Sequence, residues 1–173
     1  MPHTALEHAQ TLAHLLAARG WMLATAESCT GGMIASTCTD LPGSSAWLDC
    51  SFVTYSNSAK QRMLHVPAEL ISRHGAVSEP VVRAMAQGAV QHSAAQVAIA
   101  VSGVAGPGGG SAEKPVGTVW MAWQIQDATH CVCQHFAGDR HAVRAQTTAH
   151  ALRTLCDLLK LSHKSHHLTH SPS

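Results

Sequence analysis

The sequence predicts an α/β fold, in which short buried strands alternate with amphipathic helices. Apolar residues with helical spacing at 6–16 precede an apolar run at 21–26 that is typical of a strand. Two more strands are expected at 50–55 and 96–101, the latter of the short apolar kind found in buried parallel sheets. We therefore expect functional groups in the turns after these strands, where open α/β sheets bind their ligands.

Helices and a hairpin are expected between and after these strands. The helix from Met33 ends near Leu41, because Pro42 disfavours helical geometry in the residue before it. A short helix stops at Gly75, and the next begins at Ser78, which we expect to cap it.

The C-terminal part of the sequence predicts two strands, at 116–124 and 129–136, that pair as a hairpin. A last helix starts at 138–140. We expect one domain over residues 1–162 and a polar, histidine-containing tail at 163–173 that is disordered.

The composition excludes several classes of function. A net charge of +1 and a charged fraction of 12% do not indicate nucleic-acid or anionic-membrane binding. The chain has neither an apolar stretch of about 20 residues, as a membrane span needs, nor a secretory signal. The 6 cysteines contain no C-x-x-C pair, so we expect reduced thiols in a cytoplasmic protein, with no metal site and no cofactor.

The first informative motif is Thr25-Ala26-Glu27-Ser28-Cys29-Thr30-Gly31-Gly32. It joins a strand to a helix and so places Ser28 at the carboxyl end of the strand. Unpaired amides of Thr30, Gly31 and Gly32 at a helix N-terminus would stabilise a phosphate or an oxyanion. The alternative is a turn that needs glycine for packing, with Ser28 or Thr30 as the helix cap.

The second motif is Tyr55-Ser56-Asn57-Ser58-Ala59-Lys60. One of its polar residues caps a helix that begins near Ala59, so Lys60 lies in the first turn. The helix dipole disfavours a cation there and lowers the pKa of the lysine, as a general base requires. The alternative is a solvated surface lysine.

The third motif is a glycine-dense loop at 102–110, which follows the third strand. Glycine lets backbone amides approach an anion closely, but the loop lacks the G-K-[ST] ending of a P-loop. The alternative is a mobile surface loop. Arg140 and Arg144 lie one turn apart at the start of the last helix, where they face an anion or are surface residues, one of them paired with Asp139.

Taken together, the motifs resemble the CinA C-terminal domain family. The resemblance runs from about Leu6 to Leu159 and rests on six stretches in order: Ala26-Glu27-Ser28-Cys29-Thr30-Gly31-Gly32, Tyr55-Ser56-Asn57 with Lys60, Gly75-Ala76-Val77-Ser78-Glu79, Gly103-Val104-Ala105-Gly106-Pro107, Lys114-Pro115-Val116-Gly117-Thr118 and Gly138-Asp139-Arg140. It implies a three-layer α/β/α sandwich with a mixed, mostly parallel sheet.

The same resemblance implies hydrolysis of the carboxamide of nicotinamide mononucleotide to nicotinate mononucleotide and ammonia, in pyridine nucleotide salvage. It implies Ser28 as nucleophile, Lys60 as its base, and roles for Tyr55 and for Ser45 of the Gly43-Ser44-Ser45 turn. Further residues implied in binding the oxyanion or the substrate are Thr30, Gly31, Gly32, Asn57, Ser102, Gly103, Ala105, Gly106, Arg140 and Arg144. Ser102 departs from the family's usual threonine but keeps the hydroxyl. The family's large N-terminal domain is absent, so its pyrophosphatase activity and metal requirement are not carried over.

In this chemistry Ser28 attacks the carboxamide carbon and a neutral Lys60 takes its proton. Tyr55 holds Lys60 or relays the proton, and Ser45 bridges serine and lysine. Amides at 30–32 receive the oxyanion, while Arg140, Arg144 or amides near Gly106 hold the 5′-phosphate. Which glycine turn takes which group stays open.

Three alternatives remain at this stage. Cys29, served by a histidine such as His65, is a rival nucleophile. The domain can also be a nucleotide-binding or interaction module without catalysis, linked to competence or damage responses, or an amidase for another carboxamide. We expect a homo-oligomer.

Overall fold

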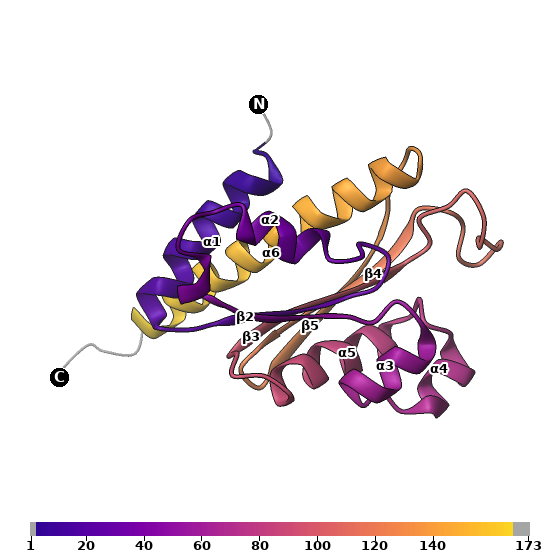
Figure 1. Ribbon diagram of the computed structural model, residues 1–173, viewed down its shortest axis with the longest axis horizontal. Helices are drawn as coiled ribbons and strands as arrows, with labels where there is room; N and C mark the ends of the chain where they lie inside the picture. The colour runs from indigo at the N-terminus through magenta and orange to yellow at the C-terminus, as the bar shows by residue number, and fades with distance from the viewer. Residues whose placement is uncertain (1–2, 168–173) are drawn as a thin grey trace.

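A computed structural model describes residues 3–167 of the chain. Its centre is a five-stranded sheet in the order β2-β1-β3-β4-β5, with helices on both faces (Figure 1). The strands are β1 (Leu23–Glu27), β2 (Leu48–Val53), β3 (Val97–Gly103), β4 (Thr118–Ile125) and β5 (Ala128–His135).

The sheet is mixed. Strand β1 pairs in parallel with both β2 and β3, whereas the pairs β3–β4 and β4–β5 are antiparallel. The predicted fold class and hairpin are confirmed, and the antiparallel share of the sheet is larger than expected. The reason is that only a loop joins β3 to β4, and a parallel pair would need a crossover connection.

Three helices cover each face of the sheet. Figure 1 shows α1, α2 and α6 on one side of the sheet and α3, α4 and α5 on the other. The first group is α1 (Ala5–Arg19), α2 (Met33–Thr39) and α6 (Arg140–His167). The second group is α3 (Asn57–Leu64), α4 (Ala68–His74) and α5 (Glu79–Gln91), and a 3-10 turn η1 (Ser44–Ala46) precedes β2.

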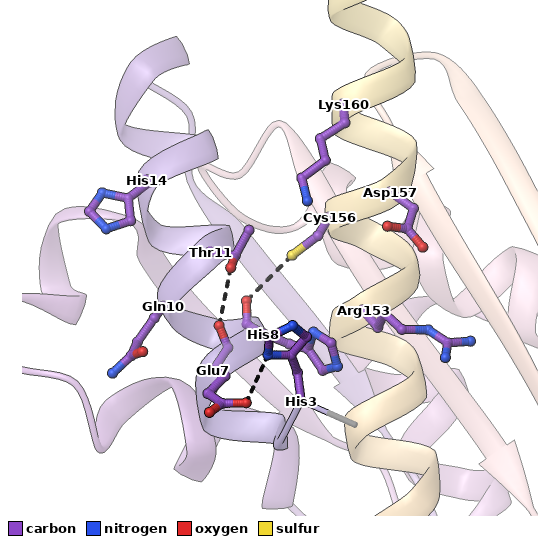
Figure 2. Close-up of a pocket in the computed structure, with 10 residues that line it drawn as sticks. All are labelled: His3, Glu7, His8, Gln10, Thr11, His14, Arg153, Cys156, Asp157 and Lys160. Atoms are coloured by element: carbon purple, nitrogen blue, oxygen red, sulfur yellow. Dashed lines mark hydrogen bonds and ion pairs between the residues drawn. The ribbon is translucent and has the colours of Figure 1, made fainter. Parts of the chain in front are cut away.

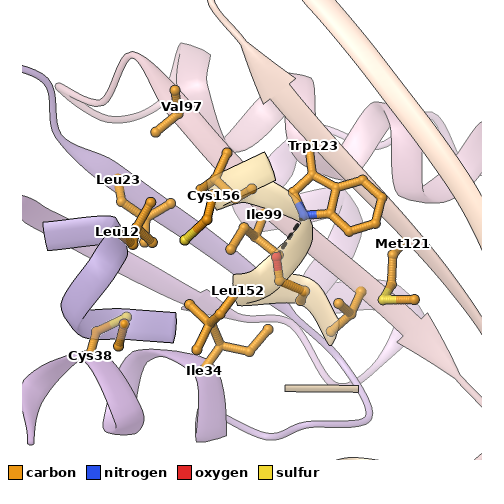
Figure 3. Packing of buried hydrophobic residues seen from close by; sticks show 14 of the residues in the cluster. Leu12, Leu23, Ile34, Cys38, Val97, Ile99, Met121, Trp123, Leu152 and Cys156 are labelled. Carbon is orange, nitrogen blue, oxygen red and sulfur yellow. Dashed lines mark hydrogen bonds between the residues drawn. The ribbon is translucent and has the colours of Figure 1, made fainter. Parts of the chain in front are cut away.

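The two faces of the sheet are packed differently. Large side chains fill the face under α1, α2 and α6, where the indole of Trp123 donates a 2.9 Å hydrogen bond to the Ala151 carbonyl (Figure 3). Alanines face α5 instead, because alternate residues of a strand point to opposite faces. They are Ala24, Ala26, Ala98, Ala100 and Ala122. This alternation puts the Glu27 side chain on the face that α2 covers, where it accepts hydrogen bonds from α2 amides.

Several element ends differ from the sequence-based expectations. Strand β2 ends at Val53, so Tyr55 lies in the loop that follows. Ser78 precedes α5, but its hydroxyl donates to the Gly75 carbonyl at 2.7 Å and does not cap the helix. Helix α6 continues to His167, five residues past the expected domain boundary, and residues 168–173 lie outside the described part. Within that part, no helix combines the length and apolarity needed to cross a bilayer.

Gly88 of α5 fixes how closely α3 and α5 approach. A Cβ added there would lie 2.2 Å from the carbonyl oxygen of Leu64, at the end of α3. Only glycine fits this contact, and the contact holds the helix that carries Lys60.

We therefore expect Gly88→Ala to lower the free energy of unfolding by about 1–3 kcal/mol, the usual cost of overpacking. The measurement is urea denaturation followed by circular dichroism. Gly108→Ala is the matched control, because an added Cβ at Gly108 meets nothing within 4 Å. Equal stability of the two variants would contradict this view of the α3–α5 contact.

Candidate active site

Ser28 lies directly after β1, at the carboxyl edge of the parallel part of the sheet. Its N–H donates to the Val101 carbonyl at 3.2 Å, which anchors the turn to β3. The residue is 8% exposed. The sheet therefore presents one nearly buried hydroxyl at the edge where ligands are expected.

The side chain of Lys60, on helix α3, contacts the Ser28 side chain. Helix α3 is capped by Ser56, whose hydroxyl accepts from the Ala59 N–H at 3.0 Å, and Lys60 lies in its first turn. The amine of Lys60 lies 3.0 Å from Ser28 Oγ, although the two residues are 32 positions apart. The structure thus brings together the two residues in which the sequence indicates catalysis.

Backbone carbonyls hold the Lys60 amine in place. Its Nζ donates to Thr54 O at 2.7 Å and to Tyr55 O at 3.3 Å. A neutral amine has two N–H donors and one lone pair. Two carbonyls therefore use both donors and leave the lone pair free for the Ser28 hydroxyl.

Burial makes the neutral form of this amine accessible. Lys60 is 1% exposed, and its desolvation lowers the pKa from 10.5 to about 8, opposed slightly by the nearby Cys29. No carboxylate pairs with the amine among the described residues. A lysine with a pKa near neutral pH next to a serine hydroxyl is an arrangement suited to general-base activation of that hydroxyl.

Glu27 anchors the Ser28 turn to the start of α2 by hydrogen bonds. Its fully buried carboxylate accepts from the Thr30 hydroxyl at 2.7 Å and from the first amides of α2, those of Ile34 at 2.9 Å and Ala35 at 3.1 Å. The hydroxyls of Thr25 and Ser51 add two more bonds. The α2 N-terminus is therefore already occupied by a carboxylate of the protein itself, a role for Glu27 that has no counterpart among the site residues expected from the sequence.

The turn amides divide into engaged and free groups. The Gly31 N–H donates to Ser28 O at 3.1 Å. In residues 3–167, the N–H groups of Thr30 and Gly32 have no hydrogen-bond acceptor. Of the three expected oxyanion donors, two have no acceptor and one is engaged in the turn, and none of the three residues is among those that line the cavity at Ser28.

A cavity of about 220 Å³ opens at the Ser28–Lys60 pair. Its walls are formed by residues at and after the carboxyl ends of β1, β2 and β3, by the loop before α5 and by the start of α6. The lining residues are Ser28, Cys29, Tyr55, Asn57, Lys60, Ala76, Val77, Ser102, Gly103, Ala105 and Arg140. Most residues that the sequence indicates for the site are among them. Ala76 and Val77 were missed as site residues, although their motif belongs to the family resemblance.

A second, wider cavity of about 660 Å³ adjoins the first, with Ala105 and Arg140 in both walls. Arg140 spans the boundary, because its Nη1 donates to Gly106 O at 2.8 Å and its Nη2 to Tyr55 Oη at 2.9 Å. Arg144 also lines the wider cavity. The two cavities together form a narrow polar end and a broad outer end with two cations.

Tyr55 and Ser45 are placed differently from the expectations. The Tyr55 side chain is 61% exposed and bonded to Arg140, so this residue contacts Lys60 through its backbone carbonyl and not through its phenol. Ser45 lies in η1, before β2, where Trp47 O accepts from Leu23 N at 2.7 Å. That is the opposite end of the parallel strands from Ser28, so the structure does not bring Ser45 to the pair.

The rival nucleophile Cys29 has no activating environment. Burial raises the pKa of its thiol to about 11, so it stays protonated at neutral pH. His65 follows the far end of α3 and stacks on His92 at 4.2 Å between ring centroids. His65 is therefore not placed to act as the base for the Cys29 thiol.

A third cavity, of about 580 Å³, lies between α1 and α6 and shares no lining residue with the first two (Figure 2). Histidines, two acidic residues, Arg153 and Lys160 line it, so its charges are balanced at neutral pH. Within residues 3–167, no three His, Cys, Asp or Glu side chains are placed to hold a metal ion.

The fold and the site define the class of protein: a three-layer α/β/α domain with a buried serine–lysine pair at the sheet edge. The chain belongs to the CinA C-terminal domain family, whose model matches residues 5–159. It is 52% identical to the nicotinamide-nucleotide amidohydrolase PncC of Escherichia coli K12, over 87% of this chain and 92% of that protein.

Solved structures agree with this assignment. The competence/damage-inducible protein CihA of Agrobacterium tumefaciens is 42% identical, with a TM-score of 0.88 over 91% of this chain and 97% of that one. Among sequence relatives, a putative competence-damage inducible protein of Symbiobacterium thermophilum is 53% identical over 83% of this chain. The match covers 36% of that longer protein.

Proposed function

We propose that this protein hydrolyses the carboxamide of nicotinamide mononucleotide to nicotinate mononucleotide and ammonia, a step of pyridine nucleotide salvage. The observation that carries the proposal is the 3.0 Å contact between the Ser28 hydroxyl and an amine whose pKa burial lowers to about 8. The 52% identity to an amidohydrolase for nicotinamide nucleotides supports the choice of substrate.

The reaction begins when Ser28 Oγ attacks the carboxamide carbon and its proton passes to the neutral Lys60 amine. The tetrahedral intermediate collapses, the C–N bond breaks, and the proton on Lys60 passes to the leaving nitrogen, which departs as ammonia. Water then attacks the acyl-enzyme with Lys60 again as base, which releases nicotinate mononucleotide and restores Ser28.

The oxyanion of both intermediates falls to the free turn amides, those of Thr30 and Gly32. They lie two and four residues after the nucleophile in the same turn, and each such donor is typically worth about 10²–10³ in rate. The Ser102 and Asn57 side chains, from the neighbouring strand and helix ends, are available to orient the carboxamide within the small cavity.

The outer cavity is suited to the ribose and the 5′-phosphate. Arg140 stands between the two cavities, so a ring seated near Ser28 would place a phosphate beyond it, within reach of that guanidinium. The expected homo-oligomer stays a prediction.

A catalytically inactive binding module is the second candidate, because several relatives carry competence-related names. The intact and buried Ser28–Lys60 pair favours the enzyme, since a buried lysine without a task is costly to retain.

The direct test is release of ammonia by the purified chain from nicotinamide mononucleotide, compared with nicotinamide and nicotinamide riboside. We expect turnover of the mononucleotide with the highest kcat/KM. No ammonia from any of the three, with folded protein, would favour the binding module.

Substitution of the nucleophile separates the two candidate residues. Ser28→Ala removes the attacking oxygen, so we expect kcat to fall by at least about 10⁴-fold, as for other members of a nucleophile–base pair, while calorimetry still detects mononucleotide binding. Cys29→Ser should keep most of the activity. Full activity of Ser28→Ala would instead assign the reaction to Cys29.

The proton acceptor predicts the pH dependence. Only neutral Lys60 takes a proton, and its pKa is lowered to about 8, so kcat/KM should rise with pH up to about 8 and level off above it. Below that value the rate should fall about tenfold per pH unit. A profile that is flat between pH 6 and 9 would contradict Lys60 as the base.

A further inference from the structure

Arg144 does not simply face the outer cavity. From the second turn of α6 its Nε donates to Cys29 O at 3.0 Å and its Nη2 to Thr30 O at 3.1 Å. These are the two carbonyls that follow the nucleophile directly in sequence. One guanidinium therefore grips two successive peptide groups of the Ser28 turn.

These two hydrogen bonds determine the directions of the neighbouring N–H groups. The peptide bonds of the turn are trans, so the carbonyl and the N–H of each peptide group point in opposite directions. Carbonyls aimed at Arg144 send the N–H groups of Thr30 and Gly31 away from it. The Gly31 N–H ends on Ser28 O, and the Thr30 N–H is left without an acceptor in the described chain.

Thr30 is held from two sides by opposite charges. Glu27 accepts from its hydroxyl at 2.7 Å on one side, and Arg144 donates to its carbonyl on the other. Thr30 is fully buried between them. The Cys29–Thr30 and Thr30–Gly31 peptides therefore cannot rotate without breaking their charge-assisted hydrogen bonds to Arg144, which are stronger than neutral ones.

We infer that Arg144 is a positioning residue of the amide hydrolysis: by holding the Cys29 and Thr30 carbonyls it fixes the backbone of the turn that carries the nucleophile Ser28. This inference rests on the proposed function for its kinetic test. It also changes the expected role of Arg144, because two of its donors are engaged by the protein.

The kinetic test uses substrates with and without the phosphate. In Arg144→Ala we expect kcat to fall about 10²-fold, the size of loss that a displacement of about 1 Å of a catalytic group can cause, with KM nearly unchanged. The loss should be equal for nicotinamide mononucleotide and nicotinamide riboside. Added guanidinium ion should restore part of the rate, and Arg144→Lys should restore little, because a single ammonium lacks the planar fork that spans two carbonyls.

Arg153→Ala is the matched control, since Arg153 lies on the same helix but lines the separate cavity of Figure 2. We expect its kinetics to match those of the unmodified protein. Thermal denaturation of both variants separates an effect on the turn from a loss of folded protein.

Two results would overturn the inference. One is a raised KM for the mononucleotide with kcat unchanged, which would make Arg144 a phosphate ligand. The other is independent of activity: if the amide resonances of Thr30 and Gly31 in a ¹⁵N–¹H spectrum stay in place in Arg144→Ala, the backbone is not held by this residue. If the unmodified protein releases no ammonia but these resonances shift in Arg144→Ala, the proposed function is refuted, and the finding that Arg144 holds the turn remains.

Discussion

The burial of one amine is the constraint on which the rest of the site depends. Lysine is rarely buried without a counter-charge, yet the Lys60 amine is enclosed by two backbone carbonyls and the Ser28 hydroxyl, with no carboxylate beside it among the described residues. Desolvation lowers its pKa toward neutrality, and the same enclosure brings it to the hydroxyl. The Ser56 cap and the contact of Gly88 with the end of α3 hold the helix in the position where both conditions are met.

The Ser28 turn is rigid for an electrostatic reason. Glu27 occupies the amides of the α2 N-terminus, and Arg144 holds the carbonyls on the opposite side. A substrate anion therefore does not meet a free helix terminus. The backbone of the turn is held by two charged residues, neither of which contacts Ser28 Oγ.

The sequence was most informative where function follows a strand end. The family resemblance paired Ser28 with Lys60, and the structure gives the physical reason for their contact: β1 and β2 are parallel neighbours whose carboxyl ends lie at the same edge of the sheet. Ser45 precedes β2, so the same topology takes it to the far edge, which a motif without strand order does not reveal. Glu27 and Arg144 were recognised as motif or anion residues, but their true contacts run through backbone groups, which leave no pattern in the sequence.

The most direct measurement is the titration of the Lys60 amine itself, followed by NMR of ¹³C-labelled lysine and assigned by loss of the signal in Lys60→Met. A midpoint near pH 8 is the result that this account predicts. A midpoint near the ordinary lysine value of about 10.4 would contradict it, because an amine that stays charged at neutral pH cannot activate Ser28.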